Sequence, residues 1–142
     1  MLLSSILSAK GDFVATITPE TSVADLTAAL TEHKVGALVV STDGRTITGI
    51  VSERDVVKAL ARGSAALDSP VSAIMTTQVF TAPPDTHVDE LMAVMTERRF
   101  RHIPVTGEDG LLIGIVSIGD VVKTRLGELE AEKAALLEYI SQ

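Results

Sequence analysis

Hydrophobic and polar residues along the chain follow one pattern that occurs twice. Each copy starts with a short run of strand-forming residues that ends near a proline, and apolar residues at helical spacing follow it. Two further apolar runs enclose an Asp-Gly pair, as in a β-hairpin, and a second helical segment comes after a serine. The order of elements predicted for each copy is therefore β-α-β-β-α.

The ends of these elements are predicted from capping and turn residues. Ser22 and Thr86 are expected to cap the first helix of each copy, and the second helices are expected to follow Ser52 and Ser117. The predicted strands are, in chain order, 14–17, 37–40, 47–51, 103–105 and 111–116.

The two copies align without a gap. Residues 14–58 lie over residues 79–123, and 18 of the 45 aligned positions are identical. The longest identical blocks are Gly-Ile-Val-Ser and Asp-Val-Val-Lys, which stand at 49–52 and 55–58 in the first copy. Two copies are too few for a solenoid, so we expect them to pack on each other as a pseudo-twofold pair.

We divide the chain into a first repeat (10–61), a linker that leads into the second repeat (62–74), a second repeat (75–125) and a C-terminal amphipathic helix (126–142). The apolar stripe of the last helix has no further chain to cover it, which predicts a homodimer. The apolar residues that a partner copy would cover are Leu126, Leu129, Leu136, Leu137 and Ile140 in the tail, and Leu2, Leu3, Ile6 and Leu7 at the start.

Composition narrows the class of protein. The 142 residues are 46% hydrophobic and carry a net charge of −7, which favours a folded chain and disfavours nucleic acid as a partner. Charged residues interrupt every apolar run before it reaches the length of a membrane span, so no membrane association is expected. The chain has no cysteine, and a cytoplasmic location is predicted.

The strongest candidate chemistry lies at the start of each second helix. Ser52 and Asp55, like Ser117 and Asp120, have the Ser-x-x-acid spacing of a helix capping box. The same geometry presents N–H groups and a hydroxyl that suit a phosphate, and a carboxylate that suits a ribose diol. Capping and ligand binding are compatible, and both interpretations stay open at this point.

A basic segment stands out in this acidic chain. Residues 98–102 read Arg-Arg-Phe-Arg-His, at the predicted end of a helix, where a solvated terminus explains them as well as a ligand does. The aligned residues of the first copy are His-Lys-Val-Gly-Ala, so the repeat itself does not require this arginine and histidine. The sequence has no histidine pair at metal-ligand spacing, no nucleophile elbow and no phosphate-binding glycine loop, which predicts neither a metal site nor an enzyme.

These residues carry a resemblance to a known family. The paired Gly-Ile-Val-Ser-x-x-Asp motifs, with Arg101–Val105 in the second copy, resemble tandem cystathionine β-synthase (CBS) domains that form a Bateman module. The resemblance covers residues 10–125, and the glutamate-rich tail is similar to that of stand-alone bacterial two-CBS proteins. It implies an α+β fold in which two β-α-β-β-α repeats pack sheet to sheet.

The resemblance also implies a function. Such a module would bind an adenosine-containing ligand, with AMP first, ADP and ATP next, and NAD(H) or S-adenosylmethionine as further possibilities, without a metal. It would act in trans on an unidentified regulated protein. The alternative is a structural or dimerisation module in which one or both pockets have lost their function.

Carried over residue by residue, the resemblance implies two pockets between the repeats. The aspartate of each would bind the ribose hydroxyls, and the serine would lie near phosphate. Gly119 and Gly36 replace the arginines of the first pocket in the second, so we expect the first to dominate binding. The first pocket would contain Ser52, Arg54, Asp55, Phe80, Phe100, Arg101 and His102, with Arg54, Arg101 and His102 as its cations. The second would contain Ser117, Asp120, Ala15, Val35 and Gly36.

Overall fold

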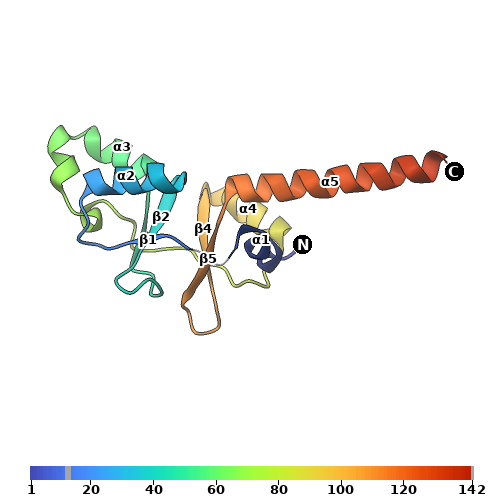
Figure 1. The fold of residues 1–142 in the computed structure, drawn as a ribbon, viewed down its shortest axis with the longest axis horizontal. Coiled ribbons are helices and arrows are strands. Elements are labelled where there is room, and N and C mark those ends of the chain that lie inside the picture. The colour runs from blue at the N-terminus through green and yellow to red at the C-terminus, as the bar shows by residue number, and fades with distance from the viewer. Residues whose placement is uncertain (12–13, 142) are drawn as a thin grey trace.

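The computed structural model describes residues 1–11 and 14–141 and has the α+β architecture predicted from the sequence (Figure 1). The first repeat contains β1 (Thr16–Ile17), α2 (Val23–His33), β2 (Ala37–Val40), β3 (Gly49–Ser52) and α3 (Glu53–Leu60). The second contains α4 (Val88–Arg98), β4 (His102–Thr106), β5 (Leu112–Ser117) and α5 (Ile118–Ser141). An N-terminal helix, α1 (Leu3–Lys10), and two 3-10 helices, η1 (Ser64–Asp68) and η2 (Val71–Ala73), complete the chain.

The two sheets share one pairing pattern. In the first repeat β1 runs parallel to β2, which pairs antiparallel with β3 in the predicted hairpin. In the second repeat β4 and β5 form the antiparallel hairpin. The counterpart of β1 shortens to a single parallel bridge between Ala82 and Val105, at the register where the first repeat pairs Ile17 with Val40. The predicted strand order is therefore kept in both copies.

The helix caps predicted from the sequence are confirmed with one exception. Ser22 caps α2, because its Oγ accepts the Asp25 N–H at 3.1 Å. The expectation that Thr86 caps α4 is wrong: the N-cap is His87, and its side chain makes no capping hydrogen bond. His87 is the residue that the repeat alignment places over Ser22, so the shared register outweighs the local preference for a threonine cap.

Each repeat has its own apolar core between its sheet and its helices. Val23, Leu26 and Val51 are fully buried in the first core, and Leu91, Ile103 and Val116 are buried to the same extent in the second. The period of these residues along α2 and α4 is the helical spacing that the sequence shows.

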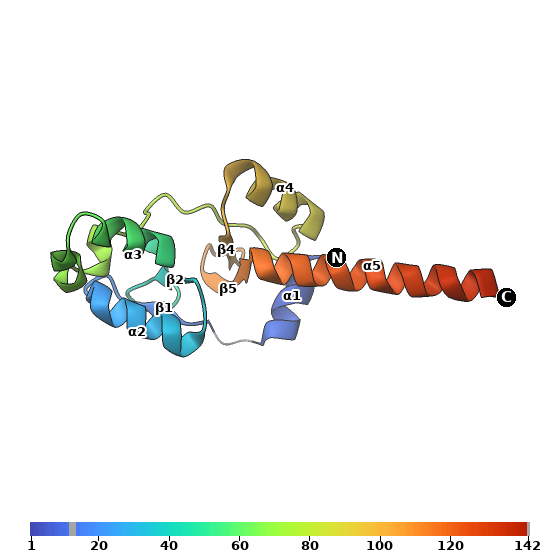
Figure 2. The ribbon, with the colours of Figure 1, turned by 90° about the horizontal axis from the view of Figure 1, so that it is seen from above.

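The segments that precede the repeats are exchanged between them. We call residues 1–10 and 69–78 the lead-in segments. The N–H of Leu3 donates to the Thr86 carbonyl at 2.9 Å, and the N–H of Val71 donates to the Thr21 carbonyl at 2.7 Å. The first lead-in segment thus packs on the second repeat, and the second packs on the first (Figure 2).

This exchange corrects part of the expected dimer surface. Leu3 and Ile6, which we expected to need a partner copy, are buried in the core of the second repeat within the same chain. In the tail, α5 runs on past the body as one helix with its second half exposed (Figure 1). Gln142, the end of the predicted tail helix, lies outside the described residues. Within the part of the chain that the structure describes, no helix has the length and hydropathy needed to cross a bilayer.

Candidate functional site

A cleft of about 460 Å³ opens between the two repeats. All seven residues predicted for the first pocket line it, and from the second predicted pocket Gly36 and Ser117 line it too. Ala15, Val35 and Asp120 are not part of its lining. The residues expected in one ligand pocket are therefore brought together by the fold, whereas those of the other are divided between this cleft and its surroundings.

Asp55 is held in place at the start of α3 by a complete capping box. Its Oδ2 accepts hydrogen bonds from the Ser52 N–H at 2.9 Å and from the Ser52 hydroxyl at 3.2 Å, and the Asp55 N–H donates to Ser52 Oγ at 3.3 Å. These bonds satisfy the helix start, which confirms the capping interpretation. They engage one carboxylate oxygen, Oδ2, and they fix the direction of a carboxylate on the wall of the cleft.

The equivalent Ser117–Asp120 pair at the start of α5, which we call the second corner, has a cation as an additional partner. Asp120 Oδ2 accepts the Ser117 N–H at 2.9 Å and also Nζ of Lys10 at 2.7 Å. Burial of the Asp120 carboxyl raises its pKa, but the hydrogen bonds from Lys10 and Ser117 outweigh burial, so its pKa lies below the usual value. The contact of Lys10 could not be predicted from the sequence, because it joins residues 110 positions apart.

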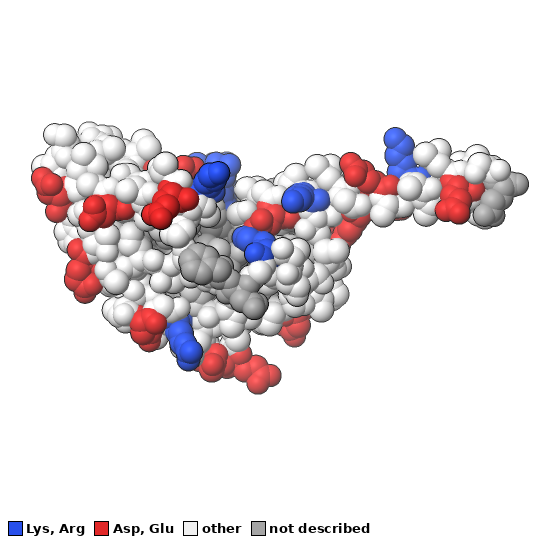
Figure 3. Space-filling view, viewed as in Figure 1, with Lys and Arg blue, Asp and Glu red and all other residues white. Residues whose placement is uncertain are grey.

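The cations of the cleft are three arginines. Arg54 lies in the first turn of α3, and Arg101 lies just before β4. Arg99, which was not among the residues predicted for either pocket, also lines the cleft. Arg99 ends α4 in a left-handed conformation with φ of 60°, as Lys34 does at the matching end of α2 with φ of 56°. Figure 3 shows Lys and Arg side chains gathered where the two repeats meet.

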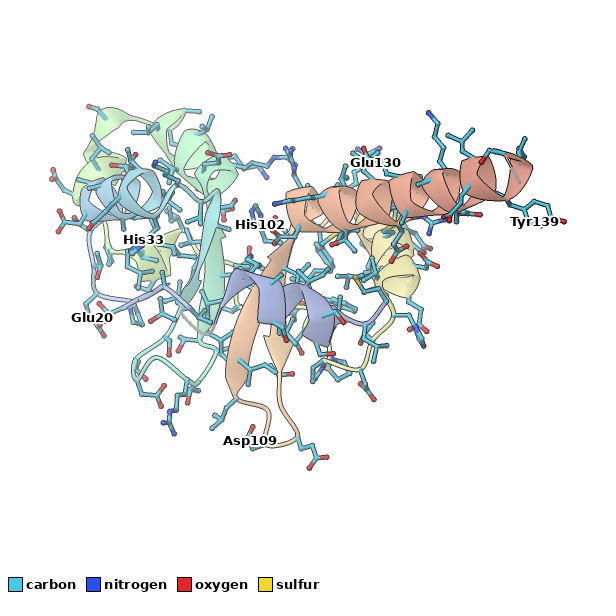
Figure 4. The ribbon with its side chains drawn as sticks, turned by 45° about the vertical axis from the view of Figure 1, so that its right-hand side comes forward. Glu20, His33, His102, Asp109, Glu130 and Tyr139 are labelled. Carbon is cyan, nitrogen blue, oxygen red and sulfur yellow. The ribbon has the colours of Figure 1, made fainter. Side chains whose placement is uncertain are left out.

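His102, the fourth basic side chain of the cleft, has a reduced pKa. Burial lowers its pKa below the usual value, and the neighbouring Arg101 lowers it further, while Glu53 acts in the opposite direction. This reduced pKa argues against the expectation that His102 serves as a cation. Figure 4 shows His102 at the junction of the repeats, beside the start of α5, where a neutral imidazole can donate or accept a hydrogen bond.

Two phenylalanines provide an aromatic surface in the cleft. The rings of Phe80 and Phe100 stack with centroids 5.8 Å apart and planes at 29°, and the guanidinium of Arg98 lies 5.6 Å from the Phe80 centroid. A flat, partly exposed aromatic pair beside cations suits a planar ring that carries a negatively charged group.

Gly36 keeps the opposite wall of the cleft open. A Cβ at this position would lie 3.3 Å from Glu53 Oε1 and 3.3 Å from Cε1 of His102. The Glu53 N–H donates to the Gly36 carbonyl at 2.9 Å, which ties the start of α3 to this glycine. Glu53 is a second residue missed in the sequence, and its carboxylate offsets part of the arginine charge. Among the described residues, no group of three or more His, Cys, Asp and Glu side chains is placed to hold a metal ion.

Comparisons with known proteins agree with this architecture. The family model described as CBS domain matches residues 11–62 and 71–127. The CBS domain-containing protein CBSX3, mitochondrial, of Arabidopsis thaliana is 40% identical over 138 residues, which are 94% of this chain and 66% of that relative. The crystal structure of the CBS-domain containing protein ATU1752 from Agrobacterium tumefaciens aligns with a TM-score of 0.83 and 45% identity, covering 88% of this chain and 99% of that one.

Two further solved structures are described with ligands. CBSX2 in complex with AMP aligns with a TM-score of 0.67 and 30% identity, covering 80% of this chain and 88% of that one. The CBS domain pair of protein MJ0100, in complex with 5-methylthioadenosine and S-adenosyl-L-methionine, aligns with a TM-score of 0.77 and 25% identity, covering 87% and 98%. With two matches to the family model and two repeats that share one fold, the chain belongs to the CBS-domain family as a tandem CBS-domain pair.

Proposed function

We propose that this protein is a regulatory module that binds one adenine nucleotide in the cleft between its repeats, with AMP as the first candidate and ADP or ATP next. The observation that carries the proposal is the juxtaposition of a fixed carboxylate, Asp55, with three arginines in one cleft. Adenosine is the part shared by the ligands of the two related complexes, which supports the ligand class.

Each part of a nucleotide has a complementary group in the cleft. The ribose hydroxyls donate to the carboxylate of Asp55, whose position the capping box sets. The phosphate is attracted by Arg54, Arg99 and Arg101, and charge-assisted hydrogen bonds of this kind contribute about 1.5–3 kcal/mol each. The adenine ring packs against apolar groups, which include the Phe80–Phe100 pair. NAD(H) and S-adenosylmethionine share the adenosine part and remain the secondary candidates.

Thermal melts of the wild-type chain and of Arg101→Ala, each with AMP or with adenosine, test this proposal. AMP is expected to raise the Tm of the wild-type protein. Arg101→Ala is expected to weaken AMP about tenfold and to leave adenosine nearly unchanged, because the substitution removes a contact to phosphate alone. The protein must first be denatured, stripped of any co-purified nucleotide and refolded, and the released compound identifies the ligand directly.

The opposite result would favour the structural alternative. If AMP, ADP, ATP and adenosine all leave the Tm of stripped protein unchanged, the cleft does not bind an adenine nucleotide. The chain then acts as a structural or dimerisation module. We propose that binding involves no chemical turnover, and a steady release of phosphate or adenine in the presence of ATP would contradict this. The cytoplasmic location stays a prediction, since the Arabidopsis relative is described as mitochondrial.

We also propose that the protein is a homodimer that acts in trans on another protein. The exposed stripe of α5 supports this, since Leu126 is 55% exposed, Leu136 56% and Ile140 76%. Apolar surface of this extent on one helix is unfavourable in water and is normally covered by another chain. Light scattering is expected to give twice the 15.0 kDa mass of the chain at micromolar concentration. A mass that stays at that of one chain over this range would contradict the dimer.

A further inference from the structure

The two lead-in segments are equivalent, and their equivalence assigns a counterpart to Lys10. Leu3 and Val71, 68 residues apart, bond to Thr86 and Thr21, which are themselves equivalent in the two repeats. Counting along both segments from this pair, Lys10 corresponds to Gln78. Gln78 is a neutral side chain that lines the same cleft as Asp55, whereas Lys10 brings a positive charge to the corner of Asp120.

The ammonium group of Lys10 makes two hydrogen bonds at that corner. Nζ donates to Asp120 Oδ2 at 2.7 Å and to the carbonyl oxygen of Ile115 at 2.9 Å. Both acceptors belong to the segment that leads from β5 into α5, the equivalent of the segment that places Asp55 in the cleft. Lys10 therefore uses the same kind of carboxylate that Asp55 offers to a ligand in the first repeat.

The contact is sheltered and electrostatically favourable. The Lys10 side chain is 37% exposed and that of Asp120 is 23% exposed, so water screens the pair less than it screens a fully exposed ion pair. The reduced pKa of the Asp120 carboxyl agrees with a carboxylate that already has a cation as its partner. A hydroxyl pair from a ribose must compete with this ammonium group for the same oxygen.

We propose that Lys10 is an intramolecular occupant of the second corner, which keeps Asp120 from binding a ribose and restricts the protein to one nucleoside per chain. The inference rests on the proposed function, because it takes Asp55 as the ribose-binding carboxylate of the open cleft. It differs from the earlier account of the asymmetry, which rests on missing arginines: Lys10 acts on the sugar and not on the phosphate.

Calorimetric titration with adenosine tests this proposal, because adenosine has no phosphate and the arginines do not enter the comparison. The titration is made in an Asp55→Ala chain, in which the cleft between the repeats is expected to bind adenosine only weakly. Adding Lys10→Gln, which copies Gln78, is expected to strengthen adenosine binding about tenfold or more. Lys10→Arg keeps the charge and serves as the matched control, with no gain expected. Asp120→Ala is expected to abolish the gain.

A second measurement uses the chain with Asp55 intact. The stoichiometry of adenosine is expected to rise from one per chain in the wild type to two in Lys10→Gln, with circular dichroism confirming that both are folded. Unchanged or weaker binding in Lys10→Gln, or two sites in the wild type, would overturn the role of Lys10 while the proposed function stands. A wild-type chain that binds no adenosine, together with a Lys10→Gln chain that binds one, would overturn the proposed cleft and support Lys10.

Discussion

Replacing Asp55 with Ala is expected to abolish most of the stabilisation that an adenine nucleotide gives to this protein. A ligand present at a hundredfold excess over its Kd stabilises the folded state by about 2.7 kcal/mol. The carboxylate of Asp55 is held by Ser52 on the cleft wall, so its removal deletes the proposed acceptor for the ribose hydroxyls and leaves the arginine side chains in place. Thermal melts with AMP, made on stripped protein, measure the loss.

Asp120→Ala is the matched control for this experiment. The two aspartates occupy equivalent positions and make equivalent backbone hydrogen bonds, with Ser52 N–H and Ser117 N–H each at 2.9 Å. Loss of either aspartate removes one side of a capping box, and loss of Asp120 also removes the ion-pair partner of Lys10, so each variant is compared with and without ligand. The effect on ligand-induced stabilisation is expected to differ strongly, and equal losses from both substitutions would contradict the assignment of the cleft.

Gly49→Ala is expected to destabilise the protein by about 1–3 kcal/mol, as overpacking does in a tight interior. A Cβ at this position would lie 2.8 Å from the carbonyl oxygen of Thr76 and 2.8 Å from Sδ of Met75. The carbonyl cannot move away cheaply, because Thr76 exchanges two backbone hydrogen bonds of 2.9 Å with Ile50. Urea unfolding followed by circular dichroism measures the change in the free energy of unfolding.

Gly127→Ala provides the opposite control. Gly127 lies within α5, and a Cβ there would meet no atom within 4 Å. The substitution is expected to raise the free energy of unfolding by about 0.4–1 kcal/mol, because alanine loses less backbone entropy in a helix than glycine does. If Gly49→Ala proved as harmless as Gly127→Ala, the close crossing of the second lead-in segment over β3 would be wrong.

The parts of the fold that the sequence predicted are those set by local signals that occur twice. The serine and aspartate that begin α3 and α5 are identical in type and spacing, and each pair forms the expected hydrogen bonds. Both predicted hairpins form around their Asp-Gly pairs, although the connection in the first repeat runs over residues 41–48 and is longer than a tight turn. The error at Thr86 arose where a good capping residue stands one position before the true cap, His87.

The parts that the sequence did not predict depend on contacts between distant segments. The repeats align at an offset of 65 residues, whereas the lead-in segments correspond at an offset of 68. A gap-free alignment of the repeats therefore does not pair Lys10 with Gln78. Arg99 lies within the basic segment that the sequence singled out, but its place in the cleft follows from the left-handed end of α4. The reduced pKa of His102 results from burial, which composition does not reveal.

The exchanged lead-in segments set an order of events during protein synthesis. Leu3 and Ile6 leave the ribosome before the residues that cover them, which extend to Val121. At about 5–20 residues per second, α1 waits on the order of 5–20 s for its binding surface to be made. The first repeat can close sooner, because its core needs no residue beyond Met75 of the second lead-in segment. The first repeat can therefore fold before the second has been made, whereas α1 has no binding surface until the second repeat is complete.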